Sequence, residues 1–543
     1  MRVVIIGGVA GGMSAATRLR RLDESAEIIV LERSGHVSYA NCGLPYYVGG
    51  VISDENKLYL QTPDSLHKRF RLDVRVNHEV IDISSEKKAV IVRDLLSAQK
   101  SEIHFDKLIL SPGATPIVPP IAGIERALTL RTVEDVLRIY EAVEVKPKSA
   151  VVIGGGFIGV EMAENLVHKG IKTSLIEALP QVLAPLDPEM AELVHQELRK
   201  NGIDLHLANS VKEITSEEVI LSDGSKVSAE LVIASIGVKP DITLARAAGV
   251  EIGSKGGISV NGFNQTSNPD IYAIGDVAEK NDDLTGESTL IPLANIANRH
   301  GRITADHIAG KKVREVSSVG TAIVKVFDLA VATTGWNAKK LRALGREFTE
   351  IHTHPNSHAT YYPGATQFSL KLIFDPKSGE IFGAQGVGRD GVDKRIDVIS
   401  TSIRAGITAP ELADLELAYA PPFGSAKDPV NMLGYIADNI VSKSTEIAQW
   451  SEINKFILDG YALVDVRSPS EYANGTIPGS INIPVDELRE RHLEINNKKV
   501  IVNCQVGQRG HVATMLLRSL GYDAKNLDGG YLTWINSPAG NIK

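Results

Sequence analysis

The sequence predicts an α/β protein with several domains, and three observations support this class. The chain has 543 residues, enough for three or four domains of ~150 residues each. A short apolar strand, a glycine-rich turn and a helical pattern follow one another near residue 1 and again near residue 150. A polar segment at 442–445 precedes a further α/β pattern that runs to residue 543.

Composition excludes several classes of protein. Hydrophobic residues make up 43% and charged residues 23% of the chain, as in globular enzymes. The net charge of −8 argues against a basic nucleic-acid binder. No apolar run reaches the ~20 residues of a membrane span, and the N-terminus lacks the pattern of a signal peptide, so we expect a cytoplasmic protein without membrane partners. Two cysteines exclude a disulfide framework and four-cysteine metal sites.

The first repeat has the pattern of a dinucleotide-binding unit. A strand at 3–6 leads into Gly7–Gly12, a helix at 13–22 and a second strand at 27–31. Glu32 follows that strand, where a carboxylate can accept hydrogen bonds from a ribose. Val9 occupies the place of the second glycine. Taken alone, this segment is also compatible with an ordinary strand–helix turn.

The second repeat fits the same pattern fully. A strand at 150–153 precedes Gly154–Gly159, a helix extends to Lys169, and the strand at 173–176 ends at Glu177. An acidic residue here favours an unphosphorylated ribose, and residues 178–180 offer no basic side chain for a 2′-phosphate. We therefore expect NADH rather than NADPH.

Three further segments complete the order of motifs. A strand at 108–110 leads into the turn Ser111–Thr115, and residues 231–240 repeat that arrangement. The strand at 271–274 ends in Gly275 and Asp276, whose carboxylate suits a polyol.

With these motifs in this order, residues 1 to about 440 resemble the pyridine-nucleotide-disulfide oxidoreductases. The resemblance implies FAD on the first glycine loop with Asp276 on the ribityl chain, NADH on the second loop, and a C-terminal α+β dimerisation domain, hence a homodimer. The domains it implies are an FAD-binding domain at 1–146 and 243–315, an NAD-binding domain at 147–242, and a dimerisation domain at 316–440. The FAD residues it implies are Gly7, Ala10, Gly11, Gly12, Glu32, Arg33, Asn41, Val80, Ser111, Gly113, Asp276 and Ala294. The NAD residues it implies are Gly154, Gly156, Phe157, Ile158, Gly159, Glu161, Glu177 and Gly237.

The segment around Cys42 separates the branches of this family. Disulfide reductases of the glutathione and lipoamide type carry a second cysteine where this chain has Tyr47. Cys42 therefore works as a sulfenic acid, or as a mixed disulfide or persulfide with an external thiol. Peroxidase relatives carry a histidine where this chain has Ala10, and the segment 41–47 instead resembles the coenzyme A-disulfide reductase branch.

That branch implies further site residues. Tyr361 and Tyr419 would place hydroxyls near the sulfur, with Tyr419 reaching across the dimer. Arg18 and Arg21 lie one helical turn apart, and we expect them to bind phosphates of coenzyme A. Lys68, Arg69 and Arg71 offer additional charge, and Arg69 is assigned to the site. The coenzyme A residues implied are Ser14, Arg18, Arg21, Ser38, Asn41, Cys42 and Arg69.

Residues 445–543 resemble a rhodanese domain. Its markers are Asp465–Arg467, Ile477–Asn482, the loop Cys504–Arg509 and Leu527–Gly530. The loop precedes a helix, so its N–H groups form an anion-binding nest that lowers a thiol pKa and stabilises a persulfide on Cys504. Phosphatases that share this fold have a longer loop, which this chain lacks. We therefore expect the loop to carry sulfur rather than phosphate, with Cys504 and Arg509 as the catalytic pair.

A group of histidines, His352, His354 and His358, precedes Tyr361. We expect it to lie in a loop without a carboxylate or cysteine ligand, and we predict no metal site there.

Together these patterns predict a flavoprotein that reduces persulfides and polysulfides such as coenzyme A persulfide with NADH, releasing sulfide, with sulfur supplied through Cys504. One alternative is a coenzyme A-disulfide reductase with an accessory sulfurtransferase domain. Another, of a different class, is a persulfide carrier or sensor with a structural flavin.

Overall fold

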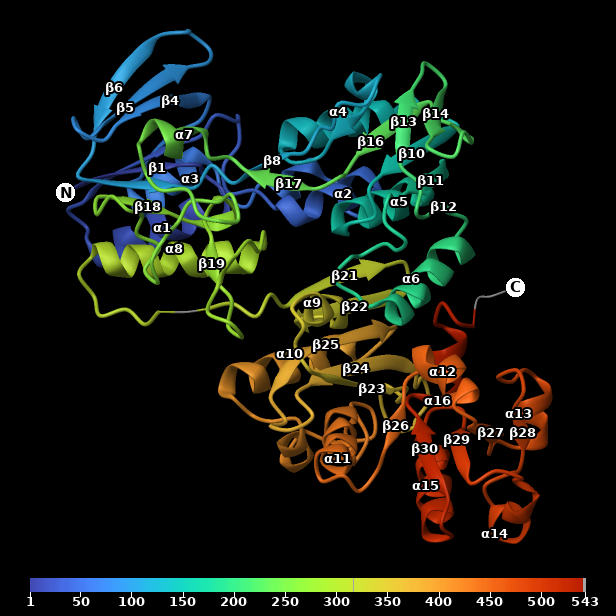
Figure 1. The fold of residues 1–543 in the computed structure, drawn as a ribbon. Helices are drawn as coiled ribbons and strands as arrows, with labels where there is room; N and C mark the ends of the chain where they lie inside the picture. The colour runs from blue at the N-terminus through green and yellow to red at the C-terminus, as the bar shows by residue number, and fades with distance from the viewer. Residues whose placement is uncertain (316, 541–543) are drawn as a thin grey trace. The chain divides into compact units, whose positions relative to one another are not determined.

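The computed structural model describes residues 1–315 and 317–540. The chain forms two compact units, Met1–Pro180 with Gly202–Ser318 and Gln181–Asn201 with Val319–Lys543. The predicted α/β class is confirmed, because each unit combines sheets with covering helices (Figure 1).

The first unit contains a parallel sheet in the order β18-β7-β1-β2-β3. Its strands are β1 (Arg2–Ile6), β2 (Glu27–Leu31), β3 (Asp73–Arg75), β7 (Lys107–Leu110) and β18 (Ile271–Ala273). Strands β2 and β3 lie on one side of β1 in this sheet, and β7 and β18 lie on the other side of β1. The carboxyl ends of β1 and β7 therefore form a switch point, where such sheets bind ligands.

Helices α1 (Ala10–Leu22) and α8 (Ala294–Ile308) lie side by side on one face of this sheet (Figure 1). Met13, Ala16 and Leu19 of α1 recur at helical spacing and pack on the β-branched side chains of β1 and β2. The helix begins at Ala10, three residues before the expected start, because the glycines already form its first turn. This packing fixes the glycine loop at the sheet edge.

A second parallel sheet in the same unit repeats this topology in the order β12-β11-β10-β16-β9. Its strands are β9 (Leu128–Thr129), β10 (Ser149–Ile153), β11 (Lys172–Ile176), β12 (Asp204–His206) and β16 (Leu231–Ala234). Helix α5 (Phe157–His168) follows the second glycine loop. The switch point here lies between β10 and β16.

Smaller elements of the unit are α2 (Leu44–Val48), α3 (Pro63–Phe70), β4 (His78–Ser84), β5 (Ala89–Asp94), β6 (Lys100–His104), β8 (Ala114–Pro116), α4 (Val133–Glu144), β13 (Val211–Ile214), β14 (Glu218–Leu221), β15 (Lys226–Ser228), β17 (Val238–Pro240), α7 (Thr243–Ala247), β19 (Lys280–Asn281) and β20 (Ser288–Thr289).

The second unit contains an antiparallel sheet in the order β21-β22-β25-β24-β23. Its strands are β21 (Ala322–Val326), β22 (Leu329–Gly335), β23 (Thr349–Thr353), β24 (Phe368–Phe374) and β25 (Ile381–Gly388). Every residue of β24 and β25 is buried. The helices of this part are α6 (Pro188–Lys200), α9 (Ala338–Ala343), α10 (Val392–Ala405) and α11 (Pro429–Val441).

The C-terminal part of the second unit is a parallel sheet in the order β26-β30-β29-β27-β28. Its strands are β26 (Ile447–Ala448), β27 (Ala462–Asp465), β28 (Ile481–Asn482), β29 (Lys499–Asn503) and β30 (Asp523–Leu527). Its helices are α12 (Ile453–Leu458), α13 (Pro469–Ala473), α14 (Leu488–Arg491), α15 (Gln508–Ser519) and α16 (Gly530–Ile535). Separate apolar clusters lie on the two faces of the sheet.

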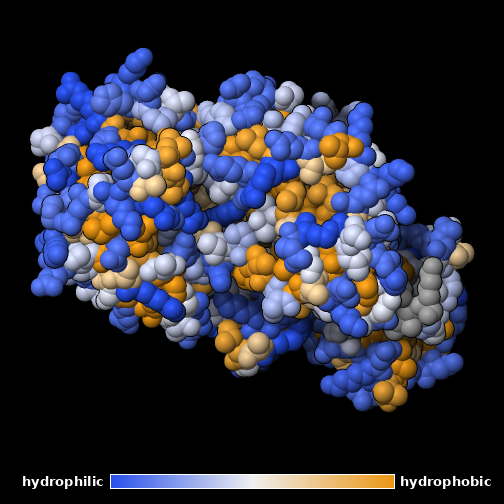
Figure 2. Space-filling model, turned by 90° about the horizontal axis from the view of Figure 1, so that it is seen from above, coloured by the Kyte–Doolittle hydropathy of each residue, from blue (hydrophilic) through white to orange (hydrophobic). Residues whose placement is uncertain are grey.

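The surface carries hydrophobic as well as hydrophilic residues. On the face that Figure 2 shows, hydrophobic residues form separate patches among hydrophilic ones. Among the described residues, no helix combines the length and the apolar character that crossing a bilayer requires.

Candidate functional site

The first glycine loop has no room for side chains at two positions. Gly7 has φ +99°, and a Cβ there would lie 2.1 Å from the carbonyl oxygen of Ser111. A Cβ on Gly12 would lie 1.9 Å from the carbonyl oxygen of Gly7. The loop backbone thus packs closely against Ser111 and leads into the N-terminus of α1, a setting that favours a phosphate.

Glu32 lies at the end of β2 beside this loop. Its Oε2 accepts a hydrogen bond from the Gly8 N–H at 2.8 Å, and its Oε1 accepts one from Ser34 at 2.9 Å. Burial raises the pKa of Glu32, and these two N–H groups oppose the shift. The carboxylate is therefore held at the sheet edge, where a ribose hydroxyl can reach it.

Asp276 lies in the turn that follows β18. Its Oδ2 is 2.6 Å from Nη2 of Arg131, and Nζ of Lys280 donates to the carbonyl oxygens of Gly275 and Ala278, both at 2.7 Å. Burial lowers the pKa of Lys280 to about 8, and Asp276 opposes this shift. Sequence reasoning missed Arg131 and Lys280, since neither belongs to a recognisable spacing.

The remaining residues assigned to FAD are spread over several elements. Val80 is buried in β4, Ala294 is the first residue of α8, and Gly113 has φ +76°. Arg33 is 3.7 Å from Asp241 in an ion pair. The glycine cradle, Glu32, Ser111 and Asp276 all follow the carboxyl ends of neighbouring strands. This donor set fits an adenine dinucleotide with a polyol chain.

The second glycine loop repeats this geometry. Gly154 has φ +105°, and a Cβ there would lie 2.4 Å from the carbonyl oxygen of Ser235. A Cβ on Gly159 would lie 1.8 Å from Gly154, whereas one on Gly156 would meet no atom within 4 Å. Glu177 accepts hydrogen bonds from Gly155 at 2.6 Å and Leu179 at 2.8 Å. The open space at Gly156 is the room that a pyrophosphate needs.

Cys42 lies in a 3-10 turn at Asn41–Gly43, immediately before α2. Both cysteines of the chain are free, and Cys42 is exposed. The surrounding atoms raise the pKa of its thiol, mainly through desolvation and then through Glu161, while Arg131 opposes the shift. Tyr47 occupies the position of the missing second cysteine and is buried.

Glu161, which was assigned to the nicotinamide, lies in the electrostatic environment of Cys42. The hydroxyl of Tyr46 donates to Oε1 of Glu161 at 3.2 Å. Burial raises the pKa of Glu161 to about 7, although this hydrogen bond opposes the shift. The carboxyl group is therefore poised to hold or release a proton near neutral pH.

The residues assigned to coenzyme A differ in their surroundings. The hydroxyl of Ser14 donates to Oδ1 of Asn298 at 2.5 Å, and Arg18 forms an ion pair of 2.6 Å with Asp306. Arg21 and Arg69 are exposed, and Ser38 has φ +47°. Arg18 and Arg21 were expected to share one phosphate-binding face, but Arg18 already has a carboxylate partner on α8. Sequence reasoning missed Asn298 and Asp306, which lie far along the chain.

Tyr361 and Tyr419 lie together in the second unit. Their hydroxyls are 2.8 Å apart, and the two residues are 74% and 47% exposed. They line a cavity of about 290 Å³ together with Asn356, His358, Lys427 and Met432. Lys427 is a cation that sequence reasoning did not single out.

The loop that contains Cys504 forms a compact anion nest. Cys504 is fully buried, and its Sγ accepts a hydrogen bond from the Gly507 N–H at 3.2 Å. Gly507 has φ +93° and precedes α15. Arg509 donates to both oxygens of Glu471 at 2.8 and 2.6 Å, which lowers the pKa of Glu471 to about 2. The predicted loop residues are therefore brought together at the start of a helix.

The histidine group differs from its expected setting. His352 lies in β23 and not in a loop, and its ring nitrogens contact carboxylates of Asp528 and Glu189. His354 contacts the hydroxyls of Ser369 and Thr533. These carboxylates were not expected, because they come from residues 176 and 163 positions away.

Known protein families match most of the chain. Residues 1–301 match the pyridine nucleotide-disulphide oxidoreductase family, residues 321–429 match its dimerisation domain, and residues 448–537 match the rhodanese-like domain.

Individual proteins are similar over most of their length. A coenzyme A disulfide reductase of Staphylococcus aureus is 34% identical over 440 residues, which cover 80% of this chain and 99% of that protein. The structure of reduced CoADR-RHD from Bacillus anthracis is 49% identical with a TM-score of 0.97 and covers 98% of both chains. The structure of a NAD-dependent persulfide reductase from A. fulgidus is 36% identical with a TM-score of 0.93, covering 98% of this chain and 100% of the other.

Proposed function

This chain belongs to the pyridine nucleotide-disulphide oxidoreductase family, and we propose that it reduces persulfides with NADH, releases sulfide and receives sulfur through a rhodanese cysteine. It is an oxidoreductase of a family that uses FAD and a pyridine nucleotide. The substrate, coenzyme A persulfide or polysulfide, and the choice of NADH are parts of the proposal. So are the residue assignments and the homodimer, which the match to a dimerisation domain supports.

The observation that carries the proposal is the setting of Cys42. It is a free, exposed thiol with Tyr47 where a second cysteine would stand, and the only other cysteine is the buried Cys504. A thiol without a neighbouring cysteine cannot close an internal disulfide, so any disulfide exchange at Cys42 takes place with an external sulfur compound. The Glu177 carboxylate favours NADH over NADPH, because it would repel the 2′-phosphate of NADPH.

The chemistry follows from this setting. The Cys42 thiolate attacks the inner sulfur of coenzyme A persulfide, the sulfur–sulfur bond breaks, and hydrosulfide leaves while a mixed disulfide forms. FAD, when bound to the first glycine loop, supplies the electron pair from NADH that cleaves this disulfide. Glu161 with Tyr46 can hold or deliver the proton that the leaving thiolate takes up, and Tyr361 and Tyr419 offer further hydroxyl donors. One NADH is oxidised for each persulfide reduced to thiol and hydrosulfide.

The fused rhodanese domain favours a persulfide over a disulfide substrate. The nest around Cys504 suits a persulfide anion, and disulfide reduction alone has no use for it. The alternative is a coenzyme A disulfide reductase, the activity named for the Staphylococcus relative. Steady-state kcat/KM values for coenzyme A persulfide and coenzyme A disulfide separate the two, and a larger value for the disulfide would contradict the proposal.

Two cysteine variants test the roles of the sulfurs. Cys42→Ser should abolish NADH oxidation with either substrate and spare thiosulfate sulfurtransferase activity. Cys504→Ser should abolish sulfurtransferase activity, lower polysulfide turnover and leave disulfide reduction intact. Absence of any NADH turnover with sulfur acceptors would instead favour a persulfide carrier or sensor with a structural flavin. Unchanged polysulfide turnover in Cys504→Ser would refute the supply of sulfur through the rhodanese domain.

A further inference from the structure

The antiparallel sheet of the second unit contains buried charges at its β23 edge. Lys371 lies at the centre of β24 and is 1% exposed. The strand register pairs it with His352 on β23 and with Gln385 on β25. Residues paired in register point to the same face of a sheet. Charged side chains therefore meet on the face to which α6 contributes Asp187 and Glu189.

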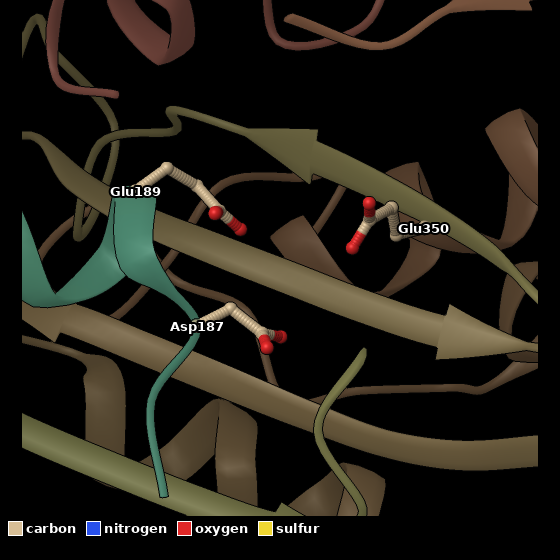
Figure 3. Close-up of side chains that lie close together, drawn as sticks. All are labelled: Asp187, Glu189 and Glu350. Carbon is tan, nitrogen blue, oxygen red and sulfur yellow. The ribbon is translucent and has the colours of Figure 1, made fainter. Parts of the chain in front are cut away.

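The carboxylates on this face surround an ammonium group. Figure 3 shows Asp187 and Glu189 at the start of α6 and Glu350 on β23 pointing toward one another. Nζ of Lys371 is 2.9 Å from Asp187, 2.5 Å from Glu189 and 2.6 Å from Glu350. Burial would lower the pKa of Lys371, but these carboxylates outweigh it and raise the pKa. The lysine thus takes the place that a metal ion would occupy among these three groups.

His352 connects this network to the rhodanese domain. Its backbone N–H donates to Oδ1 of Asp528 at 3.0 Å, and its Nδ1 is 2.5 Å from Oδ2 of the same residue. Its Nε2 is 3.0 Å from Oε1 of Glu189. A ring that meets two carboxylates donates through both nitrogens, as only an imidazolium can.

Asp528 begins the turn against which the Cys504 loop is built. Gly529 and Gly530 have φ +62° and +64°. The next N–H, from Tyr531, donates to the carbonyl oxygen of Cys504 at 2.7 Å. A Cβ on Gly530 would lie 2.4 Å from that same oxygen. The position of the turn therefore determines the position of the Cys504 backbone.

We propose that His352 is a positioning residue for sulfur transfer: its imidazolium holds Asp528, and the turn of Asp528 holds the Cys504 loop in its persulfide-binding geometry. The inference rests on the proposed role of Cys504 as a sulfur carrier. Covering the exposed edge of β23 would need only contacts to the backbone of that strand, such as the 2.7 Å hydrogen bond from the side-chain amide of Gln449 to the Glu350 carbonyl. The ion pair between the His352 ring and Asp528 is not needed to cover this edge.

The test isolates sulfur loading of Cys504 in full-length, FAD-loaded protein with Cys42→Ser. The Cys504 thiolate attacks the outer sulfur of thiosulfate, the sulfur–sulfur bond breaks, and sulfite leaves as the persulfide forms. His352→Gln keeps a hydrogen-bonding side chain without charge. We expect the second-order rate constant for sulfite release to fall about 10-fold, the scale of one lost charge-assisted hydrogen bond.

Two further variants separate positioning from general destabilisation. Asp528→Asn removes the same ion pair from the other side, so its effect and that of His352→Gln should be non-additive in the double variant. His195→Gln is the matched control, because His195 is also buried beside a carboxylate, Glu192 at 2.9 Å, and contacts no part of the turn. Loading within twofold of the parent in His352→Gln, or an equal loss in His195→Gln, would overturn the inference.

The pH profile gives a signature that packing alone would not produce. Burial would lower the pKa of His352, but Asp528 and Glu189 raise it to about 9, with Lys371 opposing them. The other groups facing this site are His354, Glu350 and Asp187. Parent loading should fall as pH rises through about 9, and this fall should be absent in His352→Gln. Identical profiles would overturn the inference. NADH-dependent reduction is measured separately in protein that keeps Cys42, and its failure there, with loading still dependent on His352, would refute only the proposed function.

Discussion

At the scale of single residues, Glu161 connects the helix after the second glycine loop with the segment around Cys42. It follows the second glycine loop, yet it accepts a hydrogen bond from Tyr46, four residues after Cys42. Its pKa of about 7 results from burial. A proton can therefore be held near neutral pH by a carboxyl group that acts electrostatically on the Cys42 thiol.

Glu161→Gln tests this through the pH dependence of stability. The folded-state pKa of about 7 exceeds the ordinary 4.5, so folding takes up a proton between these values. Stability is then fully present at low pH and is lost as pH rises through about 7. The glutamine variant should lack this decrease in the free energy of unfolding, measured by urea denaturation across the range.

Tyr46→Phe supplies the companion measurement. The Tyr46 hydroxyl lowers the pKa of Glu161, so its loss should move the decrease to higher pH. An unchanged midpoint in Tyr46→Phe, or a persisting decrease in Glu161→Gln, would show that another group titrates.

Residue-level predictions from the sequence depended on local spacing. The glycines, Glu32, Glu177, Asp276 and Cys504 could be assigned because each stands at a fixed offset from a strand end. Partners such as Arg131 for Asp276 lie 145 positions away. No sequence periodicity relates such pairs, and only the fold brings them together.

At the scale of elements, the two glycine loops show how backbone geometry separates folding from binding. Gly159 has the carbonyl of Gly154 1.8 Å from its hypothetical Cβ, whereas Gly156 has open space. Gly159 is therefore required for the fold itself, whereas a requirement for glycine at position 156 would come only from a bound ligand.

Gly156→Ala should therefore leave the free energy of unfolding within about 1 kcal/mol of the parent. It should raise the KM for NADH about 10-fold, because the new methyl group enters the space of the pyrophosphate. Gly159→Ala is the contrasting variant, which should lower the melting temperature of the protein. An unchanged KM in Gly156→Ala would place the nucleotide elsewhere.

Strand β23 illustrates what sequence could not show about an element. Its one histidine, His352, was expected in a loop, since alternation over five residues with polar side chains gives a weak strand pattern. The rhodanese domain supplies two contacts to this strand, from Asp528 to the His352 ring and from the Gln449 side chain to the Glu350 carbonyl, and no local pattern indicates them.

The stability of this edge should depend on pH with a definite sign. His352 has a folded-state pKa of about 9, above the ordinary 6.5. Its contribution is fully present below 6.5 and is lost as pH rises through about 9. The midpoint of urea unfolding of the second unit should decrease over this range in the parent and stay level in His352→Gln.

At the scale of the whole molecule, the order of domains followed from the sequence, and the family matches agree with it. The association of residues 181–201 with the second unit did not. These residues were assigned to the NAD-binding domain, but Asp187, the N-cap of α6, and Glu189 of α6 form ion pairs with Lys371 on the antiparallel sheet. These long-range ion pairs connect residues 181–201 to the second unit.

Removal of the C-terminal domain tests this organisation. A chain ending at Val441 should retain Cys42 chemistry but lose Asp528, one of the two carboxylate partners of His352, and the bond from the Gln449 side chain to the β23 backbone. We expect a lower melting temperature and concentration-dependent association through the exposed edge, measured by calorimetry and light scattering. A truncated protein as stable and monodisperse as the parent would contradict the structural role of the contact.

The contrast between an exposed Cys42 and a fully buried Cys504 has a consequence for damage. Hydrogen peroxide and alkylating toxins arrive through water, and accessible thiols are the ones they modify. Oxidants would therefore modify Cys42 before Cys504. Under the proposed function, the damaged protein would still load sulfur on Cys504 but could no longer reduce it.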